Sequence, residues 1–508
     1  MIKNEILIKK PFTRVTPTGY LRGKTTIDLS NATYYNNKLE YQIMSQADFI
    51  REFYPSGHKI NSPEFYPNRI KFDEDENGKK RFYEEKVLRV AFPFQMIIAI
   101  QQLVHLCGND IHHELTDAQV DDTMKSSFLE YQKGWLDKNM EITFYEFAKS
   151  VKITGDGAVV FYMDNGKVGT KVLSFLDGDI LYPHINSITG KMEHFARQYS
   201  DYDSEGKEII SWVEVWDNKY LYRYKQDKSG VRGTMNKLKE MFGIDGYVLD
   251  GKPELHQFDE CPVVYLRDRD GACWTFSQSN IDDFELAVSH LCQNNMAYAF
   301  PIMLLKGEDV EVKGDMYGAV KAITMGKEDD AGFMNRPEAS QSFELQFNTL
   351  LKMIFMGSFA VMPPEVKSGD LPGVAIKLIY SPSLEKAMID CKEFDSSIDS
   401  LKRLFIHGYG IERKMTVQFK AMKVISYAVP YVHQNAAELI SNLVQAVGGG
   451  FLSKETASEL STYGKNNEWD RIMREKKEEQ SADLLYQLKS QQQSAKVNEG
   501  KQDEPTNE

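Results

Sequence analysis

The chain has 508 residues, of which 42% are hydrophobic and 27% are charged, and these proportions are ordinary for a soluble globular protein. A chain of this length can bury a large core and should form more than one domain. Its formal net charge of -13 argues against a protein that holds DNA tightly by neutralising phosphates, although DNA could still slide past such a chain.

The cysteines and the apolar runs indicate a soluble protein in a reducing compartment. The five cysteines are dispersed without a CxxC pair, which argues against a disulfide scaffold and a zinc site: Cys107, Cys261, Cys273, Cys292 and Cys391. The N-terminus lacks the apolar core of a signal peptide. The two most apolar runs, Val90–Cys107 and Leu345–Met362, contain polar side chains that are costly in a bilayer, so both are predicted to be buried helices.

The first part of the chain mixes turn residues with two helical segments. The acidic run Asp73–Glu76 is typical of a solvated loop. We expect an apolar helix over Val87–Leu106, kinked or started at Pro93, and another helix over Asp117–Phe147.

After Gly155 the pattern changes from helical to strand periodicity. The Asn165-Gly166 pair predicts a tight hairpin turn between two strands. The expected strands are Ala158–Met163, Val168–Leu176, Ile180–Pro183, Met192–Tyr199, Ile209–Trp216 and Tyr220–Tyr224, closing near Val263–Arg267. An antiparallel meander beside helices predicts an α+β domain.

Two helices that flank a small insert follow the meander. Ser279, Asp282 and Asp283 form a capping signal for the first, whose seam is Ile281, Phe284, Val288, Leu291, Asn295 and Tyr298. The insert, Pro301–Ala339, should contain strands at Ile302–Leu305 and Ala319–Thr324, a charged loop through Glu311 and an acidic loop at Gly326–Pro337. The second helix carries Phe343, Phe347, Leu350 and Ile354 on one stripe, and its far half is apolar enough to predict enclosure.

The stretch Val361–Tyr380 interrupts the helical pattern. Pro363 and Pro364 stop the incoming helix, and Lys367-Ser368-Gly369-Asp370 is typical of an exposed turn. Taken alone, these residues favour an ordinary helix–helix connector; the alternative is a loop that contacts something moving past it.

A long amphipathic helix is predicted after Pro382, ending near Gly408. Its apolar stripe alternates steps of three and four: Leu384, Ala387, Cys391, Phe394, Ile398, Leu401 and Phe405. Met415–Val429 can return as a strand. Helices should follow over Asn435–Val447, Ser453–Leu460 and Trp469–Lys489, with Gly448–Gly450 stopping the first and a disordered tail from Ser490.

The sequence contains no convincing site for chemistry. It has no nucleophile elbow, P-loop or dinucleotide fingerprint, and Gly155-Asp156-Gly157 opens a strand, not a helix. His112 and His113 are adjacent and so cannot both face one metal on a regular element. Asp268-Arg269-Asp270-Gly271 lacks the terminal Glu of a calcium loop. We therefore predict a structural or mechanical protein with no catalytic residue, cofactor or metal, and keep an unfamiliar hydrolase as an alternative.

The order of elements resembles the portal protein of tailed bacteriophages, in particular the branch with a compact C-terminal crown. Three local motifs carry the resemblance: Asn280–Phe284 with Asn294-Asn295, Ser368–Leu378, and Phe451–Ala457. The resemblance covers about residues 85 to 480. The chain departs from the family pattern in its aromatic-rich N-terminal segment and in Pro363-Pro364.

The resemblance implies a portal-type α+β fold. Its parts would be a wing (1–276), stem helices (277–300 and 339–360), a clip (301–338), a tunnel loop (361–373), a long helix (374–410), a strand returning to the wing (411–427), a crown (428–489) and a tail (490–508). The residues facing DNA in the channel would be Val366, Lys367, Ser368, Gly369, Asp370 and Leu371. Those of the clip that dock the motor or adaptor would be Lys306, Glu308, Asp309, Lys313 and Lys327.

The resemblance also implies partners. The chain would form a homo-oligomeric ring, dodecameric in this family, at one capsid vertex of the virion, after assembly in the bacterial host cytoplasm. Its partners would be double-stranded DNA, the terminase large subunit, the major capsid and scaffold proteins, and head-completion or adaptor proteins, with no membrane. Another phage ring or adaptor protein remains the alternative within structural proteins.

Overall fold

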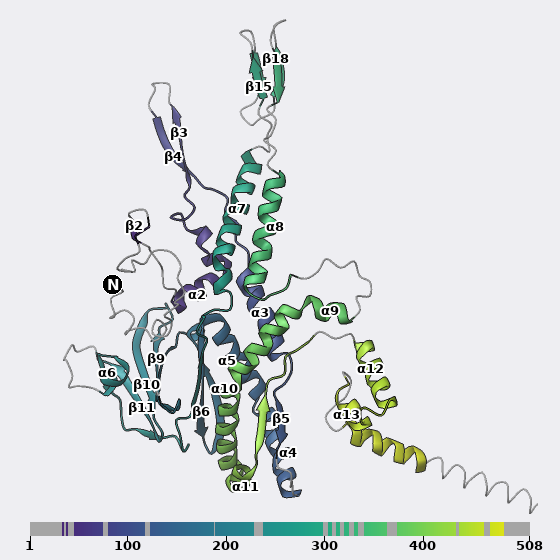
Figure 1. Cartoon of the computed structure of the whole chain (residues 1–508). Helices are drawn as coiled ribbons and strands as arrows, with labels where there is room; N and C mark the ends of the chain where they lie inside the picture. Colours follow the sequence, from purple (N-terminus) through teal and green to yellow (C-terminus); the bar gives the residue numbers. More distant parts are fainter. Residues whose placement is uncertain are drawn as a thin grey trace, which may run out of the picture. The chain divides into compact units, whose positions relative to one another are not determined.

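The structure is a computed structural model that describes residues 33–34, 37–38, 45–74, 80–116, 122–186, 188–227, 237–297, 303–306, 311–314, 320–324, 330–333, 340–362, 373–432, 436–461 and 468–481 (Figure 1). The chain divides into two compact units. The first comprises residues 1–364 and 381–431, and the second comprises residues 365–380 and 432–508.

The helices before the meander begin and end where local chemistry requires. α2 (Gln46–Phe53) starts with a capping box in which Ser45 and Asp48 bond reciprocally. α3 (Phe94–Cys107) starts directly after Pro93. The single helix expected over Asp117–Phe147 is wrong, because Asn139 adopts a left-handed φ of 53° between α4 (Asp122–Asp137) and α5 (Met140–Thr154).

A three-stranded antiparallel sheet, in the order β14-β6-β7, follows α5. Its strands are β6 (Asp156–Asp164), β7 (Lys167–Leu173) and β14 (Val263–Arg267). Asn165 and Gly166 have φ of 49° and 77°, and two left-handed residues are what a two-residue hairpin needs. The hairpin predicted from this pair is confirmed.

A six-stranded antiparallel sheet continues the meander, in the order β12-β11-β10-β9-β8 with β13 paired to β11. Its strands are β8 (Ile180–Ile185), β9 (Met192–Tyr202), β10 (Glu208–Trp216), β11 (Tyr220–Gln226), β12 (Tyr247–Leu249) and β13 (Glu254–Leu255). Phe195 and Trp216 pack with Val160 of β6, so one apolar core joins the two sheets. Val213 and Tyr224 pack on α6 (Lys237–Phe242) in a separate core.

The long helix α10 (Ser381–Arg413) forms the centre of the largest core. The predicted apolar stripe is confirmed, with Phe394, Ile398 and Phe405 at most 1% exposed. The strand expected over Met415–Val429 is only half right. Its first part is the short helix α11 (Thr416–Ala421), and only β19 (Val424–Tyr427) pairs, with β5 (His112–Leu115).

Helices α7 (Gln278–Ala297) and α8 (Ser340–Gly357) flank four short strands that form two pairs. The strands are β15 (Met303–Lys306), β16 (Glu311–Gly314), β17 (Val320–Thr324) and β18 (Asp330–Phe333). The Gly326–Pro337 loop prediction therefore missed β18. α7 begins at Gln278, directly after the short helix η5 (Thr275–Ser277), so Ser279 is not its N-cap.

Two further strand pairs precede α3. The loop expected over Asp73–Glu76 is wrong for Asp73 and Glu74, which end β3 (Arg69–Glu74) and pair with β4 (Lys80–Glu85); the other two residues lie outside the described part. The other pair is β1 (Thr33–Tyr34) with β2 (Asn37–Lys38). Short 3-10 turns complete the first unit: η2 (Pro55–Gly57), η3 (Lys59–Asn61) and η4 (Phe175–Asp177).

The second unit is helical in its described part. It contains α9 (Gly373–Ile379), α12 (Ala436–Gly448), α13 (Lys454–Glu459) and a helix over 468–481. Gly450 has a φ of 74° just after α12, which agrees with the predicted glycine stop. Ser453 caps α13 by accepting a hydrogen bond from Thr456 N at 3.0 Å. Together, the helices and antiparallel sheets confirm the α+β class.

Candidate functional site at the base of the helix pair

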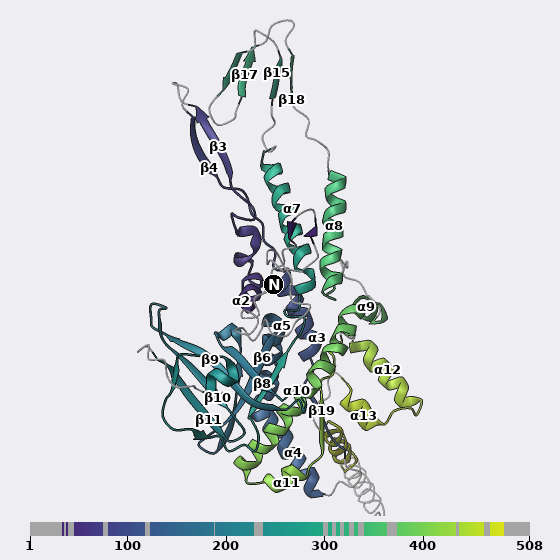
Figure 2. The same ribbon diagram turned by 60° about the vertical axis from the view of Figure 1, so that its left-hand side comes forward.

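Helices α7 and α8 pack side by side through aromatic rings (Figures 1 and 2). The ring centroids of Phe284 and Phe347 lie 4.7 Å apart, and Phe94 of α3 packs edge-on against Phe284 at 5.2 Å. Where α8 ends, Ser277 Oγ donates to Ile354 O at 2.7 Å. A Cβ added at Gly357 would lie 2.8 Å from this Oγ, so the absence of a side chain at Gly357 permits the close approach.

A ladder of hydrogen bonds attaches the extended segment Leu88–Phe92 to α7. The amides of alternate residues donate to side chains four positions apart on the helix. Phe92 N donates to Glu285 Oε1 at 2.8 Å, Val90 N to Ser289 Oγ at 2.9 Å, and Leu88 N to Gln293 Oε1 at 3.0 Å. Two residues of extended chain rise about 6.7 Å and four residues of helix about 6 Å, so the two repeats match.

Buried polar side chains also attach the first half of α7 to the N-terminal part of the chain. Glu285 Oε1 also contacts His58 Nδ1 at 2.6 Å, and both side chains are 1% exposed. Gln278, at the start of α7, donates to Glu52 Oε2 and to Asp282 Oδ1, each at 3.1 Å. Because buried polar groups are costly unless paired, these contacts fix one orientation of α7.

The chain leaving α8 is clamped by two glutamines of α3. Gln101 donates to Val361 O at 2.7 Å and accepts from Val361 N at 2.9 Å, and Gln102 donates to Ser358 O at 2.9 Å. Ser383 Oγ, on α10, donates to Phe359 O at 2.8 Å. The predicted tunnel loop therefore starts from a segment that α3 and α10 hold in place.

A buried ion cluster lies close to the first turns of α10. Asp390 Oδ1 is 2.8 Å from Lys152 Nζ of α5 and 2.7 Å from Lys386 Nζ, and the Lys152 and Asp390 side chains are at most 1% exposed. Burial by itself lowers the pKa of Lys386, but Asp390 outweighs it and the pKa is raised. Burial also raises the pKa of the neighbouring Asp268. The cluster ties α10 to α5.

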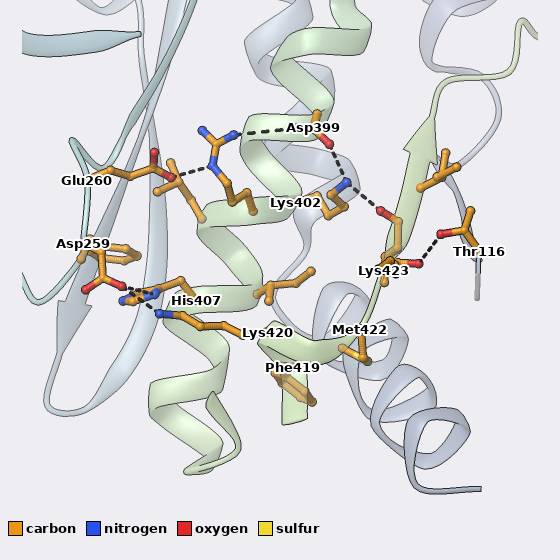
Figure 3. Close-up of a pocket in the computed structure, with 16 residues that line it drawn as sticks. Thr116, Asp259, Glu260, Asp399, Lys402, His407, Phe419, Lys420, Met422 and Lys423 are labelled. Atoms are coloured by element: carbon orange, nitrogen blue, oxygen red, sulfur yellow. Dashed lines mark hydrogen bonds and ion pairs between the residues drawn. The ribbon is translucent and has the colours of Figure 1, made fainter. Parts of the chain in front are cut away.

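A pocket of about 600 Å³ lies beside α10, α11 and β19 (Figure 3). Three of its cationic side chains face carboxylates: Lys402 lies 2.5 Å from Asp399, Arg403 2.6 Å from Glu260, and Lys420 2.8 Å from Asp259. The hydrogen bond from Lys420 lowers the pKa of Asp259. His407 also lines the pocket, with its Nδ1 3.5 Å from Asp259 Oδ2.

The predicted site residues fall mostly outside the described part of the chain. Val366, Lys367, Ser368, Gly369, Asp370 and Leu371 lie outside it, as do Glu308, Asp309 and Lys327. Lys306 is the last residue of β15, and Lys313 lies in β16. The two strands belong to different pairs, since β15 pairs with β18 and β16 with β17.

The sequence analysis did not predict which side chains attach α7 and the segment after α8 to the rest of the first unit. Gln101 and Gln102 were interpreted only as polar residues that make a membrane-spanning helix costly. Their signal was two amides in an otherwise apolar run. Glu285, Ser289 and Gln293 stand at i, i+4 and i+8 on the face beside the predicted seam, and such a polar stripe on a buried helix predicts a polar partner.

Comparison with known families decides the identity of the fold. The sequence pattern of one family, described as phage portal protein, SPP1 Gp6-like, matches residues 25–482. The chain belongs to this portal family. The resemblance to portal proteins inferred from the sequence is thus confirmed. No curated protein matches the chain.

Membership in the portal family agrees with the other observations. The family is a structural one. The helices in the described part of the chain fall short of the length and apolar character that crossing a membrane requires. Portal proteins of this family act in the phage particle, which is the general role we assign to the chain.

Proposed function

We propose that the chain forms the ring-shaped channel at one capsid vertex through which terminase packages double-stranded DNA and through which the DNA later leaves. The match to the portal family over residues 25–482 carries this proposal. Residues 301–338 dock the terminase and later the head-completion proteins, and residues 428–489 face the packaged DNA. Residues 1–276 face the capsid protein.

Exposed apolar stripes on two helices support assembly into a ring. On α8, Leu345, Met353 and Met356 are 70%, 50% and 76% exposed, so the prediction that the far half of this helix is enclosed is wrong for the single chain. On α3, Ile97, Ile100 and Val104 are also exposed, at steps of three and four. Apolar stripes of this kind are costly in water and are covered when neighbouring subunits pack on them.

The acidic balance of the chain suits a channel through which DNA slides. A wall rich in lysine would release counterions, hold DNA tightly and stall its movement. The mostly acidic chain repels phosphate weakly, and a few basic side chains such as Lys367 guide it. The bonds of Gln101 to Val361 hold the first residue of the loop, and Val366–Leu371 contact DNA.

Two experiments test the proposal. Electron micrographs of the purified full-length protein should show rings with a central hole, and an active monomer that never forms rings would refute the channel. Packaging should then be measured with Lys367→Ala and with Asp370→Ala over a range of salt concentrations. Packaging indistinguishable from wild type at every salt concentration would remove the loop from the proposal while leaving the ring intact.

A further inference from the structure

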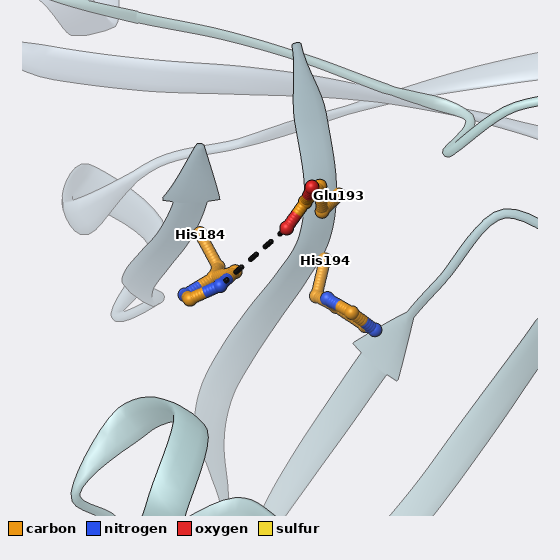
Figure 4. A group of neighbouring side chains, drawn as sticks. All are labelled: His184, Glu193 and His194. Carbon is orange, nitrogen blue, oxygen red and sulfur yellow. Dashed lines mark ion pairs between the residues drawn. The ribbon is translucent and has the colours of Figure 1, made fainter. Parts of the chain in front are cut away.

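Two histidines and a glutamate meet at the free edge of the six-stranded sheet (Figure 4). His184 lies on the edge strand β8, directly opposite His194 on β9. One ligand atom from each of His184, Glu193 and His194 lies within 4.8 Å of the other two, and His184 Nε2 is 3.7 Å from Glu193 Oε2.

A β-bulge explains why three side chains gather here. The pairing passes from His184↔His194 to Ile185↔Met192, so Glu193 is an extra residue without a partner on β8. In a regular strand, Glu193 and His194 would point to opposite faces of the sheet. The bulge breaks this alternation and lets Glu193 reach the same side as the histidines. Bulges commonly redirect side chains in this way.

The carboxylate of Glu193 is oriented by a neighbour. Asn186 Nδ2 donates to Glu193 Oε1 at 2.8 Å, which leaves Oε2 facing His184. Asn186 is itself fixed, because its Oδ1 accepts from Ile188 N and Thr189 N, each at 2.9 Å. A carboxylate held by an outer hydrogen bond is typical of metal ligands in proteins.

We propose that His184, Glu193 and His194 bind one divalent transition-metal ion, with zinc as the best fit. Two imidazoles and one carboxylate are a usual three-residue donor set for zinc, with the remaining position open to water. Calcium and magnesium prefer all-oxygen sites and should not compete. In a tetrahedral site the ligand atoms lie about 3.3 Å apart, so small side-chain rotations close the present separations.

The site is accessible to solvent, and a metal ion bound there would join two strands. The side chains of His184 and Glu193 are 45% and 42% exposed, so the ion can reach them from solvent. Its ligands come from β8 and β9, so the ion joins the edge strand to its neighbour where the bulge interrupts the hydrogen-bond ladder. This proposal departs from the sequence-based expectation of no metal, which came from spacing along the chain and not from pairing across strands.

Zinc binding to the untagged, full-length protein tests the proposal by isothermal titration after removal of metals. Wild type should bind one Zn²⁺ per chain, and zinc should raise its melting temperature. His184→Ala, His194→Ala and Glu193→Gln should each lose this site. Asn186→Ser, which keeps an acceptor for the turn, should bind about 10- to 100-fold more weakly.

His112→Ala is the matched control. His112 also faces a glutamate, with 3.8 Å between its Nε2 and Glu114 Oε2, and both side chains are about half exposed. This variant should bind zinc as wild type does. Circular dichroism without metal checks that each variant is folded. Absence of stoichiometric binding by wild type, or full binding by folded His184→Ala or Glu193→Gln, would overturn the proposal, and neither result bears on ring formation.

Discussion

Gln101 on α3 forms two hydrogen bonds with the main chain of Val361, 260 residues further along the chain. The amide group of one side chain thus satisfies both backbone groups of one residue, as a neighbouring strand would. Because Val361 is the first residue of the predicted tunnel loop (361–373), this pair attaches the start of that loop to α3.

We predict that Gln101→Ala loosens this point without unfolding the protein. Losing both bonds should cost about 1–3 kcal/mol and speed hydrogen exchange at the Val361 amide about tenfold or more. Exchange measured by mass spectrometry on peptides spanning residues 355–362 checks this. Gln346→Ala, at an exposed position of α8, is the control. Unchanged exchange in Gln101→Ala would mean that the clamp does not hold the segment.

A second prediction concerns the buried ion cluster. Asp390→Ala removes the partner of Lys152, whose side chain is 1% exposed, and should destabilise the first unit by about 3–5 kcal/mol. The double variant Lys152→Met with Asp390→Leu removes both buried charges and should cost clearly less, since Lys386 can turn toward solvent. Urea unfolding compares the two. Equal losses would contradict the role of the unpaired charge.

The third prediction is a pH dependence that comes from Asp156. Burial raises the pKa of this carboxyl to about 7, although Tyr265 and Gln46 donate to its oxygens at 3.1 and 2.5 Å. The folded state therefore holds a proton that the unfolded state has released, and stability falls as pH rises from about 4 to 7.

Asp156→Asn should remove this dependence. Between pH 5 and pH 8, wild type should lose about 2–3 kcal/mol more unfolding free energy than the variant. Urea unfolding at the two pH values measures the difference, and other titrating groups cancel in the comparison. Parallel losses in the two proteins would show that Asp156 titrates normally when folded.

The fourth prediction tests the exposed stripe of α8. Met356→Glu should leave the fold of the chain unchanged, because this side chain is 76% exposed. It should weaken ring assembly by about 2 kcal/mol or more per interface, since the new charge would be buried between subunits. Light scattering after size exclusion gives the assembled mass. Gln346→Glu adds the same charge at an exposed polar position of the same helix, and equal assembly of both variants would exclude the stripe from the interface.

Local signals in the sequence predicted much of the fold but little of the site. Asn165-Gly166 specified a hairpin, and the three-four spacing from Leu384 to Phe405 specified a long helix, because each pattern is read within a few residues. The break between α4 and α5 at Asn139 was not predicted, because asparagine adopts the left-handed conformation only occasionally.

The contacts of the site could not be predicted in the same way. Gln101 with Val361 and Lys152 with Asp390 join residues more than 200 positions apart, and periodicity carries no information about such pairs. Membership in the portal family supports the proposed function, because the turn Lys367–Asp370 does not by itself indicate contact with DNA.

The ladder between Leu88–Phe92 and α7 makes the chain more sensitive to a change in length than to a single substitution. Replacing Ser289 by alanine removes one rung and leaves its neighbours on either side in place. Inserting one residue between Glu285 and Ser289 rotates every later acceptor about 100° around the helix axis, so Ser289 and Gln293 both turn away from the segment. Homologous chains should therefore keep the number of residues between Glu285 and Gln293.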